Sequence, residues 1–257
     1  LEAQKTSSAK LMVAYRLHFE PATLDAIRRI RAGEIGEPRF FSSAFSQMVD
    51  PANHRAKHGD LAGPVLDMGP YPLNAARYLF GAEPTEVVSA VGTRDPSLGF
   101  GDLIDTVAVT LRFPGARLAQ FIVSYGANTL DSAIIAGTEG SIQLNPAFMF
   151  GMPLEQHRIT GEKRAQESFK ATDQFGGELR YFSDCILENR DPEPDAEEGY
   201  ADMRVLEAVL KAMHSGQPQT LEPFARAKRI DPDAQEQTLS MVSPPKLVNA
   251  SNPGRGK

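Results

Sequence analysis

Two residues whose types and spacing could perform proton chemistry, Asp67 and Tyr71, lie four positions apart in the segment "GPVLDMGPYPLNAARYLFG" (63–81). A tyrosine hydroxyl is a poor base at neutral pH, because its ordinary pKa is about 10. It becomes useful when a cation or a helix N-terminus lowers that pKa. A carboxylate nearby can orient a substrate hydroxyl or pass a proton on. The pair therefore suits removal of a proton from an alcohol, or its return to a carbonyl.

The residues around the pair predict how it is positioned. Leu73, Ala76 and Leu79 recur on one helical face, and Gly81 is typical of a helix end. At a four-residue spacing in helical geometry, the carboxylate and the phenol share one face. The alternative is structural: Asp67 caps the helix, and Tyr71 packs with its hydroxyl exposed.

The rest of the chain predicts an α+β fold, with a large open, mostly antiparallel sheet and helices on one face. Alternating apolar residues and short turns such as "FPGA", "GTEG" and "TGEK" are typical of antiparallel strands with one buried face. We expect helices over 20–38, after Gly69, over 174–189 and over 197–216, and strands over 39–48, 85–94, 105–113 and 117–126, with hairpins over 132–145 and 154–169. In the helix over 174–189, we expect Leu179, Phe182 and Ile186 to form the buried stripe.

The two ends of the chain carry separate predictions. The apolar run in "KLMVAYRLHF" (10–19) predicts a buried, parallel strand. Such a strand needs neighbours that the preceding residues do not supply, so we expect an N-terminal portion to be missing. Residues 231–257 are rich in Pro, Asn, Gln and Ser, and predict an extended or disordered arm.

Composition excludes several classes of protein. The 257 residues are 41% hydrophobic and 23% charged, which suits one large or two modest globular domains. The net charge of -6 argues against a nucleic-acid surface. The sequence contains no run of about 18 apolar residues, so it predicts no membrane span. No signal peptide is visible at the start, so we expect a cytoplasmic protein, although an export signal upstream of Leu1 would change that.

Cysteine and histidine give no catalytic or metal signal. The single cysteine, Cys185, excludes an internal disulfide and reads as a small core residue. His54 and His58 are four apart, but "NHRAKHGD" has the composition of a loop, so we predict no metal site.

Three segments in this order, "KLMVAYRLHFEPA", "GEIGEPRFF" and "AGPVLDMGPYPLNAARYLFGAEPTEV", resemble the Gfo/Idh/MocA family, named for glucose–fructose oxidoreductase and inositol dehydrogenase. The resemblance extends from residue 10 to about residue 216. It implies a Rossmann domain that binds NAD or NADP, and a second, mostly antiparallel α+β domain that closes over the nicotinamide. The Gly-rich dinucleotide loop and the family's Glu-Lys-Pro segment, whose lysine is catalytic, are absent from this sequence.

The resemblance implies three regions. Residues 1–19 would be a remnant of the dinucleotide-binding domain, 20–230 the substrate and oligomerisation domain, and 231–257 the arm. Half of an active site would then be present, and we expect the isolated fragment to be inactive.

The resemblance also assigns roles to single residues. Asp67 matches the family's catalytic acid. Tyr71 stands where many members have histidine. A tyrosine at this position resembles the glucose–fructose oxidoreductase and aldose-dehydrogenase branch, which implies a sugar or polyol substrate. Tyr15 and Arg16 match the junction of the two domains and would contact the cofactor, with Arg16 also near substrate oxygens.

Three further residues are candidates for substrate binding: His18, Arg55 and Lys57. Arg16 could instead form an ion pair at the domain junction. His18 could instead be a histidine that is hydrogen-bonded in place. Arg55 and Lys57 lie in a loop, where charged side chains are usually solvated.

If helices cover only one face of the sheet, the other face is exposed. We expect the strands over 105–126 to expose Ala108, Thr110, Ala119 and Phe121, or the opposite set, and predict a homo-oligomer that pairs these faces.

For the function we predict an NAD(P)-dependent sugar or polyol dehydrogenase. Two alternatives stay open: a non-enzymatic module that binds a sugar or assembles subunits, and a family member that uses transient oxidation for hydrolysis or dehydration.

Overall fold

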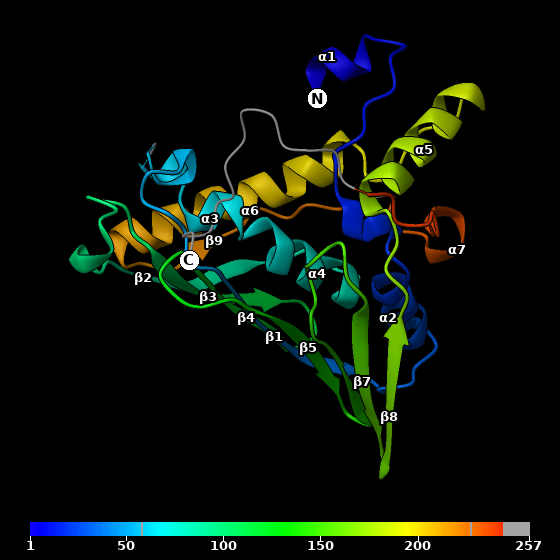
Figure 1. Ribbon diagram of the computed structural model, residues 1–257, viewed down its shortest axis with the longest axis horizontal. Coiled ribbons are helices and arrows are strands. Elements are labelled where there is room, and N and C mark those ends of the chain that lie inside the picture. Colours follow the sequence, from blue (N-terminus) through cyan, green and yellow to red (C-terminus); the bar gives the residue numbers. More distant parts are fainter. Residues whose placement is uncertain (58, 227, 244–257) are drawn as a thin grey trace.

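The computed structural model describes residues 1–57, 59–226 and 228–243, and these form an α+β fold (Figure 1). The α-helices are α1 (Glu2–Lys5), α2 (Pro21–Arg31), α3 (Pro64–Asp67), α4 (Pro70–Phe80), α5 (Gln174–Leu187), α6 (Ala196–Ser215) and α7 (Pro232–Gln235). Short 3-10 helices are η1 (Arg16–Phe19), η2 (His54–Ala56), η3 (Gly59–Leu61) and η4 (Pro96–Leu98).

Within the described residues, nine strands form one sheet in the order β8-β7-β6-β5-β1-β4-β3-β2-β9. Their bounds are β1 (Pro38–Ser46), β2 (Glu86–Thr93), β3 (Thr106–Phe113), β4 (Arg117–Ser124), β5 (Leu130–Gly137), β6 (Gly140–Leu144), β7 (Leu154–Thr160), β8 (Lys163–Phe169) and β9 (Gln219–Thr220). The pair β1–β4 is parallel and the other pairs are antiparallel. The predicted fold class is confirmed, as are the four main helices and β1 to β8. The helix predicted over 20–38 is shorter than expected, because it ends at Arg31 and Pro38 begins β1.

One face of the sheet is buried beneath helices and the other is open. Figure 1 shows α3, α4 and α6 on the same side of the sheet. On β3, Val107, Val109 and Leu111 alternate with outward residues, as predicted. On β4, however, Ala119 and Phe121 point inward. The register opposes Val109 to Phe121, so these two share the buried face and the predicted outward set was wrong for β4. Its outward residues are Leu118, Gln120 and Ile122.

The predicted strand over 10–19 is wrong. Residues 10–15 join no strand of the sheet, and Arg16–Phe19 form η1. The backbone N–H of Val13 donates to the carbonyl of Pro194 rather than to a strand. Arg16 and His18 are buried in η1, where their side chains hydrogen-bond to residues far along the chain.

Helix α5 also buries a different side from the one predicted. Leu179 and Ile186 are 67% and 53% exposed, and Tyr181 and Cys185 are buried instead. These two pack with Phe19 of η1 in a small separate core. The prediction failed because the most apolar stripe of this helix is not the side that meets the rest of the described chain, whereas Cys185 is a core residue as expected.

The chain after α6 is not a free arm where it is described. Gln219 and Thr220 pair with β2, and Thr172 and Ser240 form an isolated bridge. The Nε and Nη2 atoms of Arg28 donate to Asp233 and to the carbonyl of Pro232. Residues 231–243 are therefore held against the rest of the described chain, with α7 in place of a free arm and with Gln235 buried against Glu193. Residues 244–257 lie outside the described residues.

Candidate active site

A pocket of about 260 Å³ opens where η1, the α3–α4 junction and the start of α5 meet. Its lining residues are Ala14, Tyr15, Arg16, Leu17, Asp67, Pro70, Tyr71, Asn74 and Phe175. Four residues that were predicted as catalytic or cofactor-binding from two distant segments, Tyr15, Arg16, Asp67 and Tyr71, thus meet in one place.

The α3–α4 junction brings the carboxylate and the phenol to the same pocket. Asp67 is the last residue of α3, and Tyr71 is in the first turn of α4, so the two do not lie on one continuous helix. Gly69 makes this junction possible, because a Cβ there would lie 2.2 Å from the carbonyl oxygen of Val65. Pro70 then begins α4 at a position where no backbone N–H is needed.

Asp67 is held by two side chains and caps no helix. The Nε atom of Arg55 lies 3.3 and 3.1 Å from its Oδ1 and Oδ2 atoms. The hydroxyl of Tyr125 lies 2.9 Å from Oδ2. The N-cap residue of α4 is Gly69, and no side chain makes a capping hydrogen bond there. The structural alternative for Asp67 therefore does not describe this carboxylate.

Tyr71 is held through its ring. The ring packs against Phe45 and Phe148, with centroids 5.4 and 5.9 Å away. The guanidinium of Arg16 lies over the same ring, 5.2 Å from its centroid. These contacts fix the plane of the phenol beside a positive charge.

Arg16 is almost fully buried, with 6% of its surface exposed. It donates to Oε1 of Gln174 and to the carbonyl of Phe148. The rings of Phe150 and Phe175 lie 5.1 and 5.9 Å from its guanidinium carbon. Its described hydrogen bonds are thus to neutral acceptors, and it forms no ion pair with a described residue. Burial raises the pKa, and the positive charge of Arg16 opposes that rise, at the carboxyl groups of Glu20, Asp131 and Glu178.

Tyr15 faces the interior through its hydroxyl. Burial, followed by the nearby Asp202 carboxylate that accepts its hydrogen bond, raises its pKa well above the ordinary value. The phenol therefore remains protonated and acts as a fixed wall of the pocket rather than as a base.

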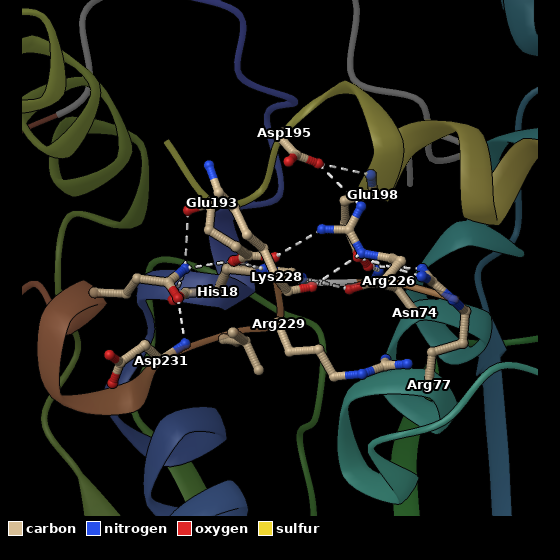
Figure 2. A network of polar contacts seen from close by, with 12 residues as sticks. His18, Asn74, Arg77, Glu193, Asp195, Glu198, Arg226, Lys228, Arg229 and Asp231 are labelled. Atoms are coloured by element: carbon tan, nitrogen blue, oxygen red, sulfur yellow. Dashed lines mark hydrogen bonds and ion pairs between the residues drawn. The ribbon is translucent and has the colours of Figure 1, made fainter. Parts of the chain in front are cut away.

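Beneath the pocket lies a buried network of charges that the sequence did not reveal (Figure 2). Its centre is Arg77, which is 1% exposed and bonds to Glu83, Glu198 and Asp202 at 2.6–3.2 Å. Arg226 binds Asp195 and Glu198 from the other side, at 2.9 and 2.8 Å. These partners lie up to 125 positions from Arg77, so no local motif marks them.

Asn74 joins this network to the pocket that it lines. Its Nδ2 atom donates to Glu198 and Asp202 at 2.8 and 3.1 Å. Its Oδ1 atom therefore faces His18 Nε2, at 2.7 Å. Carboxylates on one side fix which way the amide points.

His18 lies in the network and not in the lining of the pocket. It is 1% exposed, and its Nδ1 atom lies 3.1 Å from Glu193 Oε2. Burial lowers its pKa, but the Glu193 carboxylate and its hydrogen bond outweigh that effect and raise the pKa above the ordinary value. Both ring nitrogens face acceptors, so the contacts of His18 are those of a histidine hydrogen-bonded in place.

The remaining candidates separate into one that joins the site and one that does not. Arg55 reaches it through Asp67. Lys57 is exposed and is not part of the pocket lining. His58 lies outside the described residues.

Within the described ranges, no group of three or more His, Cys, Asp or Glu side chains is arranged to hold a metal ion. In the same ranges, no helix combines the length and apolarity that a membrane crossing needs.

Comparison with known proteins gives a family. Residues 23–143 match the GFO/IDH/MocA C-terminal domain. This segment is therefore a domain of the Gfo/Idh/MocA family. Among relatives, a D-xylose 1-dehydrogenase [NADP(+)] of Haloarcula marismortui is 36% identical over 216 residues, which are 79% of this chain and 58% of that protein. A scyllo-inositol 2-dehydrogenase (NAD(+)) of Bacillus subtilis is 28% identical over 86% of this chain and 68% of that protein.

A solved structure agrees with this membership of the Gfo/Idh/MocA family. The aldose-aldose oxidoreductase from Caulobacter crescentus, complexed with glycerol, has a TM-score of 0.78 and 31% identity over 86% of this chain. The alignment covers 66% of that protein's chain. This chain thus spans 58% of the haloarchaeal relative and 66% of the solved structure.

The pocket fits part of the dinucleotide that the family implies. Its volume of about 260 Å³ lies below the roughly 300–1,000 Å³ of pockets that enclose a drug-sized ligand. Apolar walls from Leu17, Pro70 and Phe175 suit a planar ring, and the polar groups of Asp67 and Tyr71 suit a hydroxylated substrate. The described residues therefore fit the nicotinamide end and a substrate, and they offer no cradle for the pyrophosphate.

Proposed function

We propose that this chain supplies the substrate side of an NAD(P)-dependent oxidoreductase that acts on a sugar or polyol hydroxyl or on the matching carbonyl. The observation that carries the proposal is the meeting of Asp67 and Tyr71 in one pocket with Tyr15 and Arg16. The xylose and inositol dehydrogenases among the relatives, and the aldose-aldose oxidoreductase, support a carbohydrate substrate.

Each side chain has a separate task in this proposal. Tyr71 accepts the hydroxyl proton as the alcohol is oxidised, or returns it as a carbonyl is reduced. Arg16, over its ring, stabilises negative charge on the phenol oxygen. Asp67 orients the substrate hydroxyl or receives the proton from Tyr71, and Arg55 keeps the carboxylate in place. Tyr15 and Leu17 form the wall against which the nicotinamide end would lie.

The nicotinamide, when bound, supplies the acceptor or donor of hydride. The chain's own residues position the reacting carbon and move the proton, so the two parts of the oxidation are divided between cofactor and protein.

We also propose a homo-oligomer formed through the open face of the sheet. Val91 of β2 and Ile122 of β4 are 61% and 47% exposed on either side of Ala108 of β3, and Leu118 of β4 pairs with Phe40 of β1, at 44% and 47% exposed. Exposed apolar side chains gathered on one sheet face are typical of an interaction surface. The cytoplasmic location expected from the sequence remains a proposal as well.

The test mixes the intact protein with NAD or NADP and a panel of aldoses and polyols, and follows the absorbance of the reduced nicotinamide. Turnover with at least one sugar or polyol is expected. Sugar binding without any turnover or bound nucleotide would favour a non-enzymatic binding module. Release of a hydrolysed or dehydrated product with no net change in nicotinamide would favour chemistry by transient oxidation.

A further inference from the structure

Tyr125 is a buried tyrosine whose hydroxyl reaches the candidate catalytic carboxylate from the sheet. It directly follows β4 and is 0% exposed. Its backbone N–H donates to the carbonyl of Asp105 at 2.8 Å, and its own carbonyl accepts from Val49 at 3.0 Å. The end of a strand therefore fixes the position of this phenol, with Phe100 packed against its ring at 6.4 Å.

The hydroxyl of Tyr125 has two acceptors and one hydrogen. Its oxygen lies 2.9 Å from Asp67 Oδ2 and 2.9 Å from the carbonyl oxygen of Ala62. A phenol donates one hydrogen bond and accepts others, so it serves only one of these acceptors at a time. Burial, followed by the Asp67 charge, raises the pKa of Tyr125 well above its ordinary value, so the phenol keeps its own proton.

Both protonation states of Asp67 can be satisfied by this arrangement. When the carboxylate is ionised, Tyr125 donates to Oδ2. When Oδ2 carries a proton, it donates to the Tyr125 oxygen, and Tyr125 turns its hydrogen to the Ala62 carbonyl. Arg55 differs in this respect, because a guanidinium only donates and so favours the ionised state alone.

We propose that Tyr125 is a positioning residue that lets Asp67 receive and give up a proton without losing its hydrogen bond. The proposal rests on the proposed function, in which the proton comes from the substrate hydroxyl by way of Tyr71. The arriving proton binds to Oδ2 of Asp67. The hydroxyl hydrogen of Tyr125 then turns from Oδ2 to the carbonyl oxygen of Ala62. Tyr125 itself gains and loses no proton.

The first test is kinetic and uses the intact enzyme with its nicotinamide and a sugar that it turns over. Tyr125→Phe keeps the ring and removes the hydroxyl. We expect kcat to fall about 10- to 100-fold, the size of one hydrogen bond to a charged group, with KM nearly unchanged and an altered pH profile. In an Asp67→Asn background the same change should have little further effect. Tyr78→Phe, which removes another buried tyrosine hydroxyl outside the pocket, is the matched control.

The second test needs no turnover, so it stays informative if the proposed function fails. The free energy of unfolding of the 257-residue chain is measured at neutral and at acidic pH for Tyr125→Phe, Arg55→Met, Asp67→Ala and the two double variants that include Asp67→Ala. The coupling between Tyr125 and Asp67 should persist at both pH values, whereas the coupling between Arg55 and Asp67 should vanish at acidic pH.

Two results would overturn the role of Tyr125. One is an unchanged kcat and pH profile in Tyr125→Phe, or an equal loss in the Asp67→Asn background. The other is a coupling that disappears on acidification, as expected for a purely ionic contact. If the phenylalanine variant does not fold, 3-fluorotyrosine at position 125 keeps the hydroxyl and the shape. It should then shift the pH profile of kcat, and an unshifted profile counts against the proposal.

Discussion

The Nε2 atom of His18 lies 2.7 Å from Oδ1 of Asn74, an amide whose nitrogen is already committed to two carboxylates. The histidine must therefore donate from Nε2, and its Nδ1 faces the Glu193 carboxylate. With both nitrogens donating, the ring is an imidazolium that links η1 to α4. Asn74 also lines the pocket, so this buried charge supports the site from below.

The stability of the chain should depend on the charge of His18. Its folded-state pKa lies above the unfolded value of about 6.5, so its contribution is complete below about pH 6.5 and is lost as the pH rises through the folded-state value. His18→Gln keeps hydrogen-bond donors without the charge. We expect it to lower the free energy of unfolding by about 1–3 kcal/mol at about pH 6, and by less at higher pH. Denaturant unfolding of both proteins across pH measures this, and a difference that does not change with pH contradicts a charged His18.

Removal of the Tyr71 hydroxyl should affect turnover rather than folding. In the intact enzyme, we expect Tyr71→Phe to reduce kcat by about 10²- to 10⁴-fold, with little change in nicotinamide affinity, because the ring contacts with Phe45 and Phe148 remain. Steady-state kinetics and nucleotide titration measure the two effects. Tyr200→Phe, on an exposed part of α6, is the control. Equal activity in Tyr71→Phe would refute its role as the proton carrier.

The buried charge network should be costly to break at its centre. Arg77→Met leaves Glu83, Glu198 and Asp202 without their main cationic partner, and we expect a loss of about 3–5 kcal/mol in the free energy of unfolding. The exposed pair of Arg112 and Glu86 provides the control, since Arg112→Met should cost at most about 1 kcal/mol. Similar losses for the two variants would show that burial does not set the value of the network.

A single methyl group at Gly69 should disturb the site. In Gly69→Ala the new Cβ meets the Val65 carbonyl oxygen, so α3 and α4 must shift relative to one another. We expect a loss of about 1–3 kcal/mol in stability together with reduced turnover, because Asp67 and Tyr71 lie on either side of the junction. Gly81→Ala has open space but a φ of +59°, so it should cost about 1–2 kcal/mol and leave kinetics unchanged. Normal kinetics in Gly69→Ala would mean that the junction tolerates the shift.

The oligomer proposal makes a prediction about the open face of the sheet. Ile122→Lys places a charge in the middle of that face and should lower the oligomeric mass in light scattering. Leu187→Lys, on α5 and 82% exposed, should leave the mass unchanged. Dissociation by the α5 change alone would place the interface on that helix.

The sheet and its covering helices could be predicted because their patterns are local. Strand β3 alternates residue by residue, and α4 ends at a glycine in the left-handed region. Asp67, Tyr71, Tyr15 and Arg16 were found through a family resemblance, and the structure brings them together in one pocket.

Features that depend on distant partners could not be predicted. Tyr125 is 58 positions from Asp67, and it appears in the sequence as one more strand residue. The run over 10–19 has the composition of a buried strand, but its conformation is decided by polar contacts of Arg16 and His18 with residues far along the chain. Exposed Leu179 and Ile186 show the same limit, because hydrophobicity alone does not say which side of a helix meets its neighbours.

Gln235 has a consequence for how the protein is made. Its amide donates to the carbonyl and the carboxylate of Glu193 at 3.0 and 2.8 Å, and Glu193 in turn holds His18. The support beneath the pocket thus joins His18 and Gln235, which are 217 positions apart in the sequence. During synthesis, this network cannot form until Arg226 and Gln235 have emerged from the ribosome. A nascent chain that already contains Asp67 and Tyr71 therefore lacks the contacts that support the pocket.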